Sequence, residues 1–223
     1  MNHWRTACEA ALRAHSEADA IRFWGLSRPG PDGPLPVFDY RFEHTLAVVK
    51  LARWLSPLAG ADAEIVECAA WLHDCRKFLN DARSKDTHAQ DASAVVPELL
   101  AGTDFPVAKI PAVRQAIERH VGLKLKHRLE PLEAACLWDV DKLSKIGAAS
   151  LVHFTGIAGA FGAVDTAGIL ERGMQWLDRA RTIASSMNTP PARQEADRRV
   201  AFLVAHYQQL QREWRDPMEA TPP

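Results

Sequence analysis

Apolar residues at helical spacing run through almost the whole chain, and the strict alternation typical of strands is nearly absent. Several helix starts are marked by their own chemistry. Asp62 can accept backbone N–H groups ahead of "AEIVECAAWL", Pro131 suits a first helical turn, and Thr189 can cap the segment that follows it. The sequence therefore predicts an all-α protein. The expected helices lie near residues 4–25, 41–56, 62–74, 87–101, 107–122, 130–145, 147–162, 167–185 and 190–214.

One stretch interrupts this pattern, "SRPGPDGPLP" at residues 27–36. Its prolines and glycines cannot continue a helix, and it separates the first predicted helix from all the others. We expect four segments along the 223 residues. They are an N-terminal helix at 1–26, a linker loop rich in proline and glycine at 27–37, a helical domain at 38–214 and a frayed tail at 215–223.

The bulk composition argues against several classes of protein. The net charge of −1 at pH 7 provides no overall positive field for nucleic acid or for an anionic membrane surface. No stretch approaches the roughly 18 apolar residues of a membrane span, and the start of the chain does not resemble a signal peptide. The four cysteines, Cys8, Cys68, Cys75 and Cys136, form no CxxC pair. This pattern favours a cytoplasmic protein over a disulfide-linked one.

Four of the expected helices place an ionisable side chain on the face that their periodicity assigns to the interior. These side chains are His44, His73, His120 and Asp141. One histidine at such a position is usually a hydrogen-bonded core residue. A buried carboxylate is costly, however, and a divalent metal with imidazole and carboxylate ligands offsets that cost. Mixed nitrogen and oxygen ligands suit zinc, manganese, iron, nickel or cobalt without selecting one of them.

The segment "WLHDC" at residues 71–75 places His73 directly before Asp74 at the end of an apolar run. Polar residues at a helix end can simply meet water. Alternatively, a helix end allows two consecutive side chains to turn towards one ion. Periodicity alone leaves both interpretations open.

The order of these residues resembles the H…HD…D pattern of the HD-domain metal-dependent phosphohydrolase superfamily. The surrounding words are similar too, in "YRFEHTLAVVKLA", "AAWLHDCRK", "LWDVDKLSKIG" and "MNTPPARQEADRRVAFL". The resemblance to bacterial stand-alone HD hydrolases covers residues 38–214 and implies an HD-domain-like helical bundle. Two features depart from the family. Cys75 and Arg76 stand where an apolar residue and glycine are common, and no Gly-Tyr-Pro signature of cyclic-dinucleotide phosphodiesterases follows His120.

The resemblance implies roles for individual residues. The implied metal ligands are His44, His73, Asp74 and Asp141, with Asp141 preferred over its neighbour Asp139. A subset of the superfamily has a second metal, for which His88 and His120 are the candidate ligands. Asp74 is also expected to orient a water molecule, and Arg41 and Lys77 to bind phosphate.

The leading hypothesis is a metal-dependent phosphohydrolase with one or two divalent transition-metal ions, acting on a small phosphorylated substrate such as a nucleotide. The basic run "KLKHR" at residues 124–128 either binds a longer polyphosphate or faces solvent. Two other functions remain open: an HD-fold di-iron oxygenase, which needs His88 and His120 as ligands, and a non-catalytic metal-stabilised binding module. The oligomeric state does not follow from the sequence.

Overall fold

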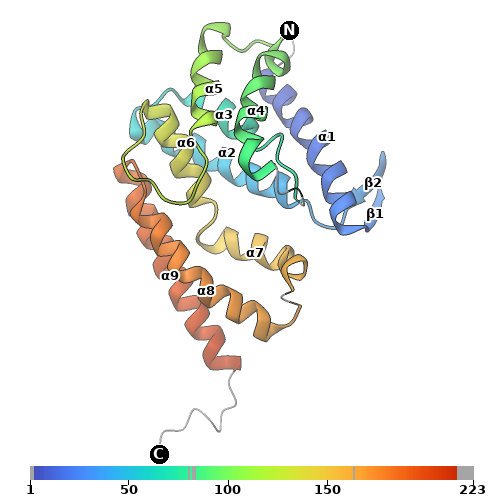
Figure 1. Cartoon of the computed structure of the whole chain (residues 1–223), viewed down its shortest axis with the longest axis vertical. Helices are drawn as coiled ribbons and strands as arrows, with labels where there is room; N and C mark the ends of the chain where they lie inside the picture. Colours follow the sequence, from blue (N-terminus) through green and yellow to red (C-terminus); the bar gives the residue numbers. More distant parts are fainter. Residues whose placement is uncertain (1–2, 80, 82–83, 163, 215–223) are drawn as a thin grey trace, which may run out of the picture.

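The computed structural model describes residues 3–79, 81, 84–162 and 164–214, so the predicted frayed tail at 215–223 lies outside the described residues. The described residues form nine α-helices, two short 3-10 helices and one small hairpin (Figure 1). In chain order these are α1 Trp4–Trp24, β1 Ser27–Gly30, β2 Gly33–Pro36, α2 Tyr40–Ala59, α3 Ala63–Leu72, α4 Ser84–Leu100, η1 Val107–Lys109, α5 Ile110–Glu118, α6 Leu132–Leu143, α7 Ala148–Gly156, η2 Ala158–Phe161, α8 Thr166–Ser185 and α9 Pro190–Trp214. The all-α prediction is confirmed.

Helix starts follow the capping chemistry that the sequence indicated, with small shifts. The Asp62 carboxylate accepts the backbone N–H groups of Glu64 and Ile65 at 3.0 and 3.3 Å, which satisfies two donors at the start of α3. At the start of α2, Asp39 accepts the N–H of Phe42 at 2.9 Å. Pro131 lies one position before α6 instead of inside its first turn.

The segment expected to be a loop at 27–37 instead contains an antiparallel hairpin, with Ser27 opposite Pro36. The sequence conceals this hairpin because proline removes a ladder donor, and Pro29 lies opposite Pro34. Both strands are edges, where proline is tolerated. Gly33, with a φ of 138°, supplies the positive φ that the turn needs. At the base of the hairpin, the indole N–H of Trp24 donates to the carbonyl of Phe38 at 2.9 Å.

The core lies where α2, α3, α5 and α6 pack against one another, with α1 and α4 added at one side (Figure 1). Its centre is made of side chains with no exposed surface, among them Val48, Leu72, Ile117 and Leu137. The α8–α9 helix pair and α7 extend from the other end of this bundle. Because the candidate site residues share faces with these apolar side chains, the packing brings them to the middle of the bundle.

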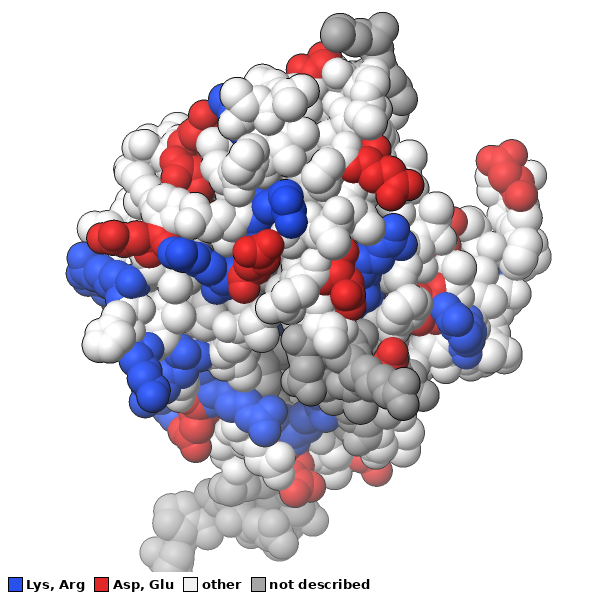
Figure 2. Space-filling model, turned by 45° about the horizontal axis from the view of Figure 1, so that its top comes forward, with Lys and Arg blue, Asp and Glu red and all other residues white. Residues whose placement is uncertain are grey.

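The surface carries charges of both signs. Figure 2 shows basic and acidic side chains interspersed over one face of the molecule, in keeping with the net charge of −1 at pH 7. In the described part of the chain, no helix is both long and apolar enough to cross a membrane.

Candidate metal centre

At the ends of α3 and α5, the same kind of hydrogen bond to a backbone carbonyl orients a histidine. The sequence predicted that both helices continue further, but α3 ends at Leu72 and α5 ends at Glu118. The Nδ1 atom of His73 lies 2.8 Å from the carbonyl of Ala70, and Nδ1 of His120 lies 2.5 Å from that of Ile117. A carbonyl only accepts, so both Nδ1 atoms carry the proton. Each imidazole therefore satisfies a carbonyl of the last helical turn and keeps a lone pair on Nε2.

A serine sets the tautomer of His44, which lies in the first half of α2. The Ser144 hydroxyl donates its only proton to the carbonyl of Asp141 at 2.7 Å. At its 3.1 Å contact with Nδ1 of His44, the same oxygen must therefore accept. The proton of His44 is on Nδ1, and Nε2 of this ring also presents a lone pair.

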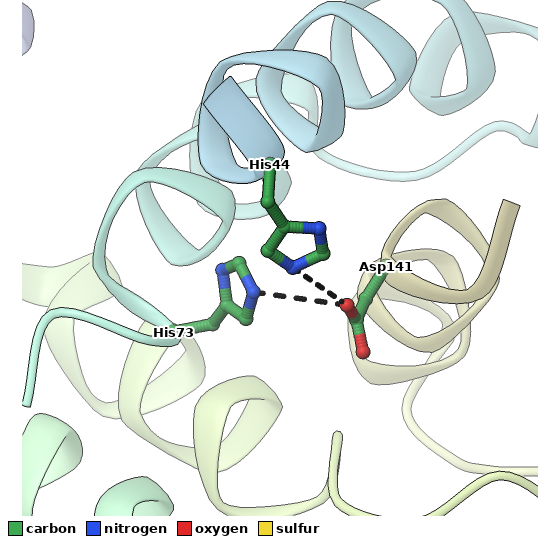
Figure 3. A group of neighbouring side chains, drawn as sticks. All are labelled: His44, His73 and Asp141. Carbon is green, nitrogen blue, oxygen red and sulfur yellow. Dashed lines mark ion pairs between the residues drawn. The ribbon is translucent and has the colours of Figure 1, made fainter. Parts of the chain in front are cut away.

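A first group of donor atoms converges from α2, α6 and the end of α3. The Oδ1 atom of Asp141 lies 3.2 Å from Nε2 of His44 and 3.8 Å from Nε2 of His73 (Figure 3). The Oδ2 atom of Asp74 lies 3.8 and 3.7 Å from the same two nitrogens. Ligands placed at about 2.1 Å from a tetrahedral ion are separated by about 3.4 Å, so the spacing suits one metal ion.

The other oxygen of Asp74 belongs to a second group. Its Oδ1 atom lies 3.4 Å from Nε2 of His88 on α4 and 3.5 Å from Nε2 of His120. The two imidazole nitrogens are 3.3 Å apart. Three donor atoms with nearly equal separations surround a common point, and Asp74 stands between the two groups with one oxygen directed at each.

The donor atoms fit a divalent transition metal. Nε2 of His44, Nε2 of His73 and Oδ1 of Asp74 are fully buried, and none has a hydrogen-bond partner among the described residues. Buried polar atoms are nearly always satisfied, so unpaired atoms inside these two groups indicate a missing partner. The Nε2 lone pairs and the carboxylate oxygens are all acceptors, so they cannot satisfy one another by hydrogen bonding. A metal cation can bind both kinds of atom.

Basic side chains keep Asp74 ionised. Burial alone raises the pKa of this carboxyl group, but the charges of Lys77 and Arg41 outweigh it and hold the pKa well below the ordinary value. The Arg41 guanidinium donates to Oδ2 of Asp74, and the Lys77 ammonium lies 3.5 Å from the same oxygen. All the residues that the sequence singled out for the site thus lie within one connected cluster.

Two further lysines belong to the cluster, and neither was predicted from the sequence. Lys145 pairs with Oδ1 of Asp141, and Lys142 pairs with Oδ2 and also donates to the carbonyl of His120 at 2.7 Å. Burial raises the pKa of Asp141, yet these two charges hold it well below the ordinary value. Helical spacing could have predicted the contact of Lys145 with Asp141. The two residues are four positions apart, which places their side chains on nearly the same face of a helix.

The structure separates the roles of Asp139 and Asp141. Both oxygens of Asp139 accept hydrogen bonds from residues 188 and 189, at the start of α9. The donors are the backbone N–H and side-chain amide of Asn188, at 2.7 and 2.9 Å, and the backbone N–H and hydroxyl of Thr189, both at 2.8 Å. Asp139 therefore joins α6 to α9, while Asp141 faces the histidines.

A family model described as the HD domain matches residues 41–146. YpgQ of Bacillus subtilis (strain 168) is 27% identical over 205 residues, which cover 91% of this chain and 96% of YpgQ. The crystal structure of Bacillus subtilis YpgQ in complex with ADP is similar, with 25% identity and a TM-score of 0.58 over 78% of this chain and 88% of that one. An HD-superfamily hydrolase from Bacillus thuringiensis shares the fold, with 20% identity and a TM-score of 0.59 over 98% and 100% of the two chains. Residues 41–146 are therefore identified as an HD domain, in agreement with the resemblance noted from the sequence.

Asparagine substitutions distinguish the two aspartates of α6. We expect Asp139→Asn to lower the free energy of unfolding by about 1–3 kcal/mol, because buried donors at the start of α9 lose their charged acceptor. This variant should still bind as much metal as the unmodified protein. We expect Asp141→Asn to lose the metal of the first group. Unfolding in urea and elemental analysis measure the two effects, and loss of metal from Asp139→Asn would reverse the assignment.

Replacement of Lys145 should strengthen metal binding. Its ammonium occupies Oδ1 of Asp141, the oxygen that faces His44 and His73, and it repels an incoming cation. We expect Lys145→Met to raise the affinity for Mn²⁺ at least about tenfold. Calorimetric titration measures this, with Lys145→Arg as a control that keeps the charge. An unchanged affinity in Lys145→Met would mean that the lysine does not compete with the metal.

The metal-free protein should lose stability in mild acid. Burial and then the charge of Lys145 lower the pKa of His44 to about 4. The pKa of an unfolded histidine is about 6.5, so between these values the unfolded chain binds more protons. Stability contributed by His44 is fully present above about pH 6.5 and is lost as the pH falls towards 4, by about 3 kcal/mol. Urea unfolding at several pH values measures this loss, and His44→Gln should show a shallower dependence.

Proposed function

We propose that this HD-domain protein is a metal-dependent phosphohydrolase that acts on a small phosphorylated molecule. The observation that carries the proposal is the position of Asp74, whose two oxygens face the Nε2 atoms of two groups of histidines. His44, His73, Asp74 and Asp141 are the proposed ligands of one ion. Asp74, His88 and His120 are proposed to hold a second ion.

When bound, a divalent ion polarises a phosphoryl oxygen and lowers the pKa of a water molecule from about 16 towards 7. The chain's own residues supply the remaining functions. Asp74 is placed to accept a hydrogen bond from the attacking water and so to orient it. The Nε atom of Arg41 is a buried donor with no partner among the described residues, and it is available to a phosphate oxygen. The Lys77 side chain is 25% exposed, so its ammonium can meet a substrate that enters from solvent.

The charges of the cluster favour an anionic substrate. Arg41 and Lys77 pair with Asp74, while Lys142 and Lys145 pair with Asp141. Four cations therefore face two carboxylates before any metal is added. A metal ion increases this excess, which attracts phosphate groups and gives no advantage to molecular oxygen. This excess argues for a phosphohydrolase over an oxygenase at the same site.

A nucleotide is the proposed class of substrate. The support comes from the crystal structure of Bacillus subtilis YpgQ in complex with ADP, a relative that is 25% identical to this chain. ADP carries a diphosphate, which matches an excess of positive charge spread over several side chains.

Two variants test the proposal together. We expect protein purified without chelator to contain between about one and two transition-metal ions per chain, and His73→Ala to lose at least one of them. We expect Asp74→Asn to lower phosphate release from nucleotides at least about hundredfold. Elemental analysis and a phosphate assay over nucleoside mono-, di- and triphosphates measure these effects.

Arg198→Ala is the control variant, since this exposed arginine of α9 pairs only with Glu195 in the described structure. It should leave metal content and phosphate release unchanged. Full phosphate release in Asp74→Asn would exclude the proposed site. Protein that binds no manganese, nickel, iron, cobalt or zinc would exclude the metal-dependent mechanism.

A further inference from the structure

A cavity of about 160 Å³ lies between α7, α8 and α9, outside the metal centre. Phe154, Trp176 and Tyr207 form its aromatic walls. Phe154 and Trp176 meet edge to face, with ring centroids 4.8 Å apart. Gly173 allows Tyr207 to lie against α8, because a Cβ at this position would come within 1.9 Å of the tyrosine ring. A cavity of about 150 Å³ can hold a benzene ring, so this one has room for a single planar ring system.

The cavity also carries positive charge. Arg172, Trp176 and Arg179 are spaced four and three residues apart, so they lie along one face of α8. The guanidinium carbon of Arg179 lies 5.8 Å from the centre of the Trp176 ring. An indole flanked by guanidinium groups suits a planar aromatic ring that is attached to an anionic group.

One residue connects this cavity to the metal centre. The indole N–H of Trp176 donates to the backbone carbonyl of Lys145 at 3.2 Å. The ammonium group of Lys145 pairs with Asp141, a proposed metal ligand. The aromatic wall of the cavity and the metal-facing carboxylate are thus separated by one lysine residue.

We propose that this cavity is the subsite for the base of a nucleotide whose phosphates lie at the metal centre. The inference rests on the proposed phosphohydrolase function and adds a determinant of substrate choice. Phe154 and Trp176 contact the face and edge of the base. Arg179, at the rim, interacts with the ring or with the phosphate nearest the sugar.

The test compares ADP with inorganic pyrophosphate, which carries the same linkage between two phosphates but has no base. Mn²⁺-loaded protein is titrated with each, using Arg179→Ala and Phe154→Leu. We expect each variant to weaken ADP binding at least about fivefold and pyrophosphate binding less than about twofold. Arg181→Ala is the matched control. It removes another exposed arginine of α8, which pairs with Asp178 and does not line the cavity, and it should change neither affinity.

Several results would overturn the subsite. They are an equal loss of affinity for ADP and pyrophosphate in the variants, unchanged ADP binding in both variants, or equal affinity of the unmodified protein for the two probes. Each of these can occur while the protein still releases phosphate from nucleotides, which leaves the phosphohydrolase proposal intact. Conversely, ADP binding that depends on Arg179 and Phe154 in a protein that releases no phosphate would support the subsite and exclude the phosphohydrolase.

Discussion

An ionised carboxylate at the centre of a helical bundle is the constraint on which the rest of this structure depends. The Asp74 side chain is only 2% exposed, and burial of such a charge without partners is very costly. Arg41 and Lys77 balance one of its oxygens from a single side. The other oxygen faces His88 and His120 and accepts no hydrogen bond from the described residues, so a buried acceptor is left between the imidazole rings.

The arrangement also links local backbone chemistry to the proposed function. A helix ends with unsatisfied carbonyl groups, and at α3 and α5 an imidazole N–H satisfies one of them. The same hydrogen bond sets the tautomer and the direction of the other ring nitrogen. The termination of a helix and the orientation of a proposed metal ligand are therefore one event, which accounts for the position of His73 and His120 just beyond helices.

Much of the fold and of the site could be predicted from the sequence, for identifiable reasons. Helical periodicity located the helices and placed His44, His73, His120 and Asp141 on interior faces. The resemblance to HD hydrolases added Asp74, Arg41, Lys77 and His88. The hairpin was missed because paired prolines conceal its strands. Lys142 and Lys145 were missed because a lysine at the end of a helix normally faces solvent, whereas the packing of α6 here directs both of them to Asp141.

The sequence by itself determined which faces of the helices are buried and which ionisable residues lie on them, since side-chain direction follows from a period of 3.6 residues. Only the tertiary structure decided between Asp139 and Asp141. They are two residues apart on one helix, so they point in different directions, and the elements that each one meets come from distant parts of the chain. Asp139 meets the start of α9, while Asp141 meets His44 of α2. The aromatic cavity likewise exists only where α7, α8 and α9 meet, because no local pattern brings Phe154, Trp176 and Tyr207 together.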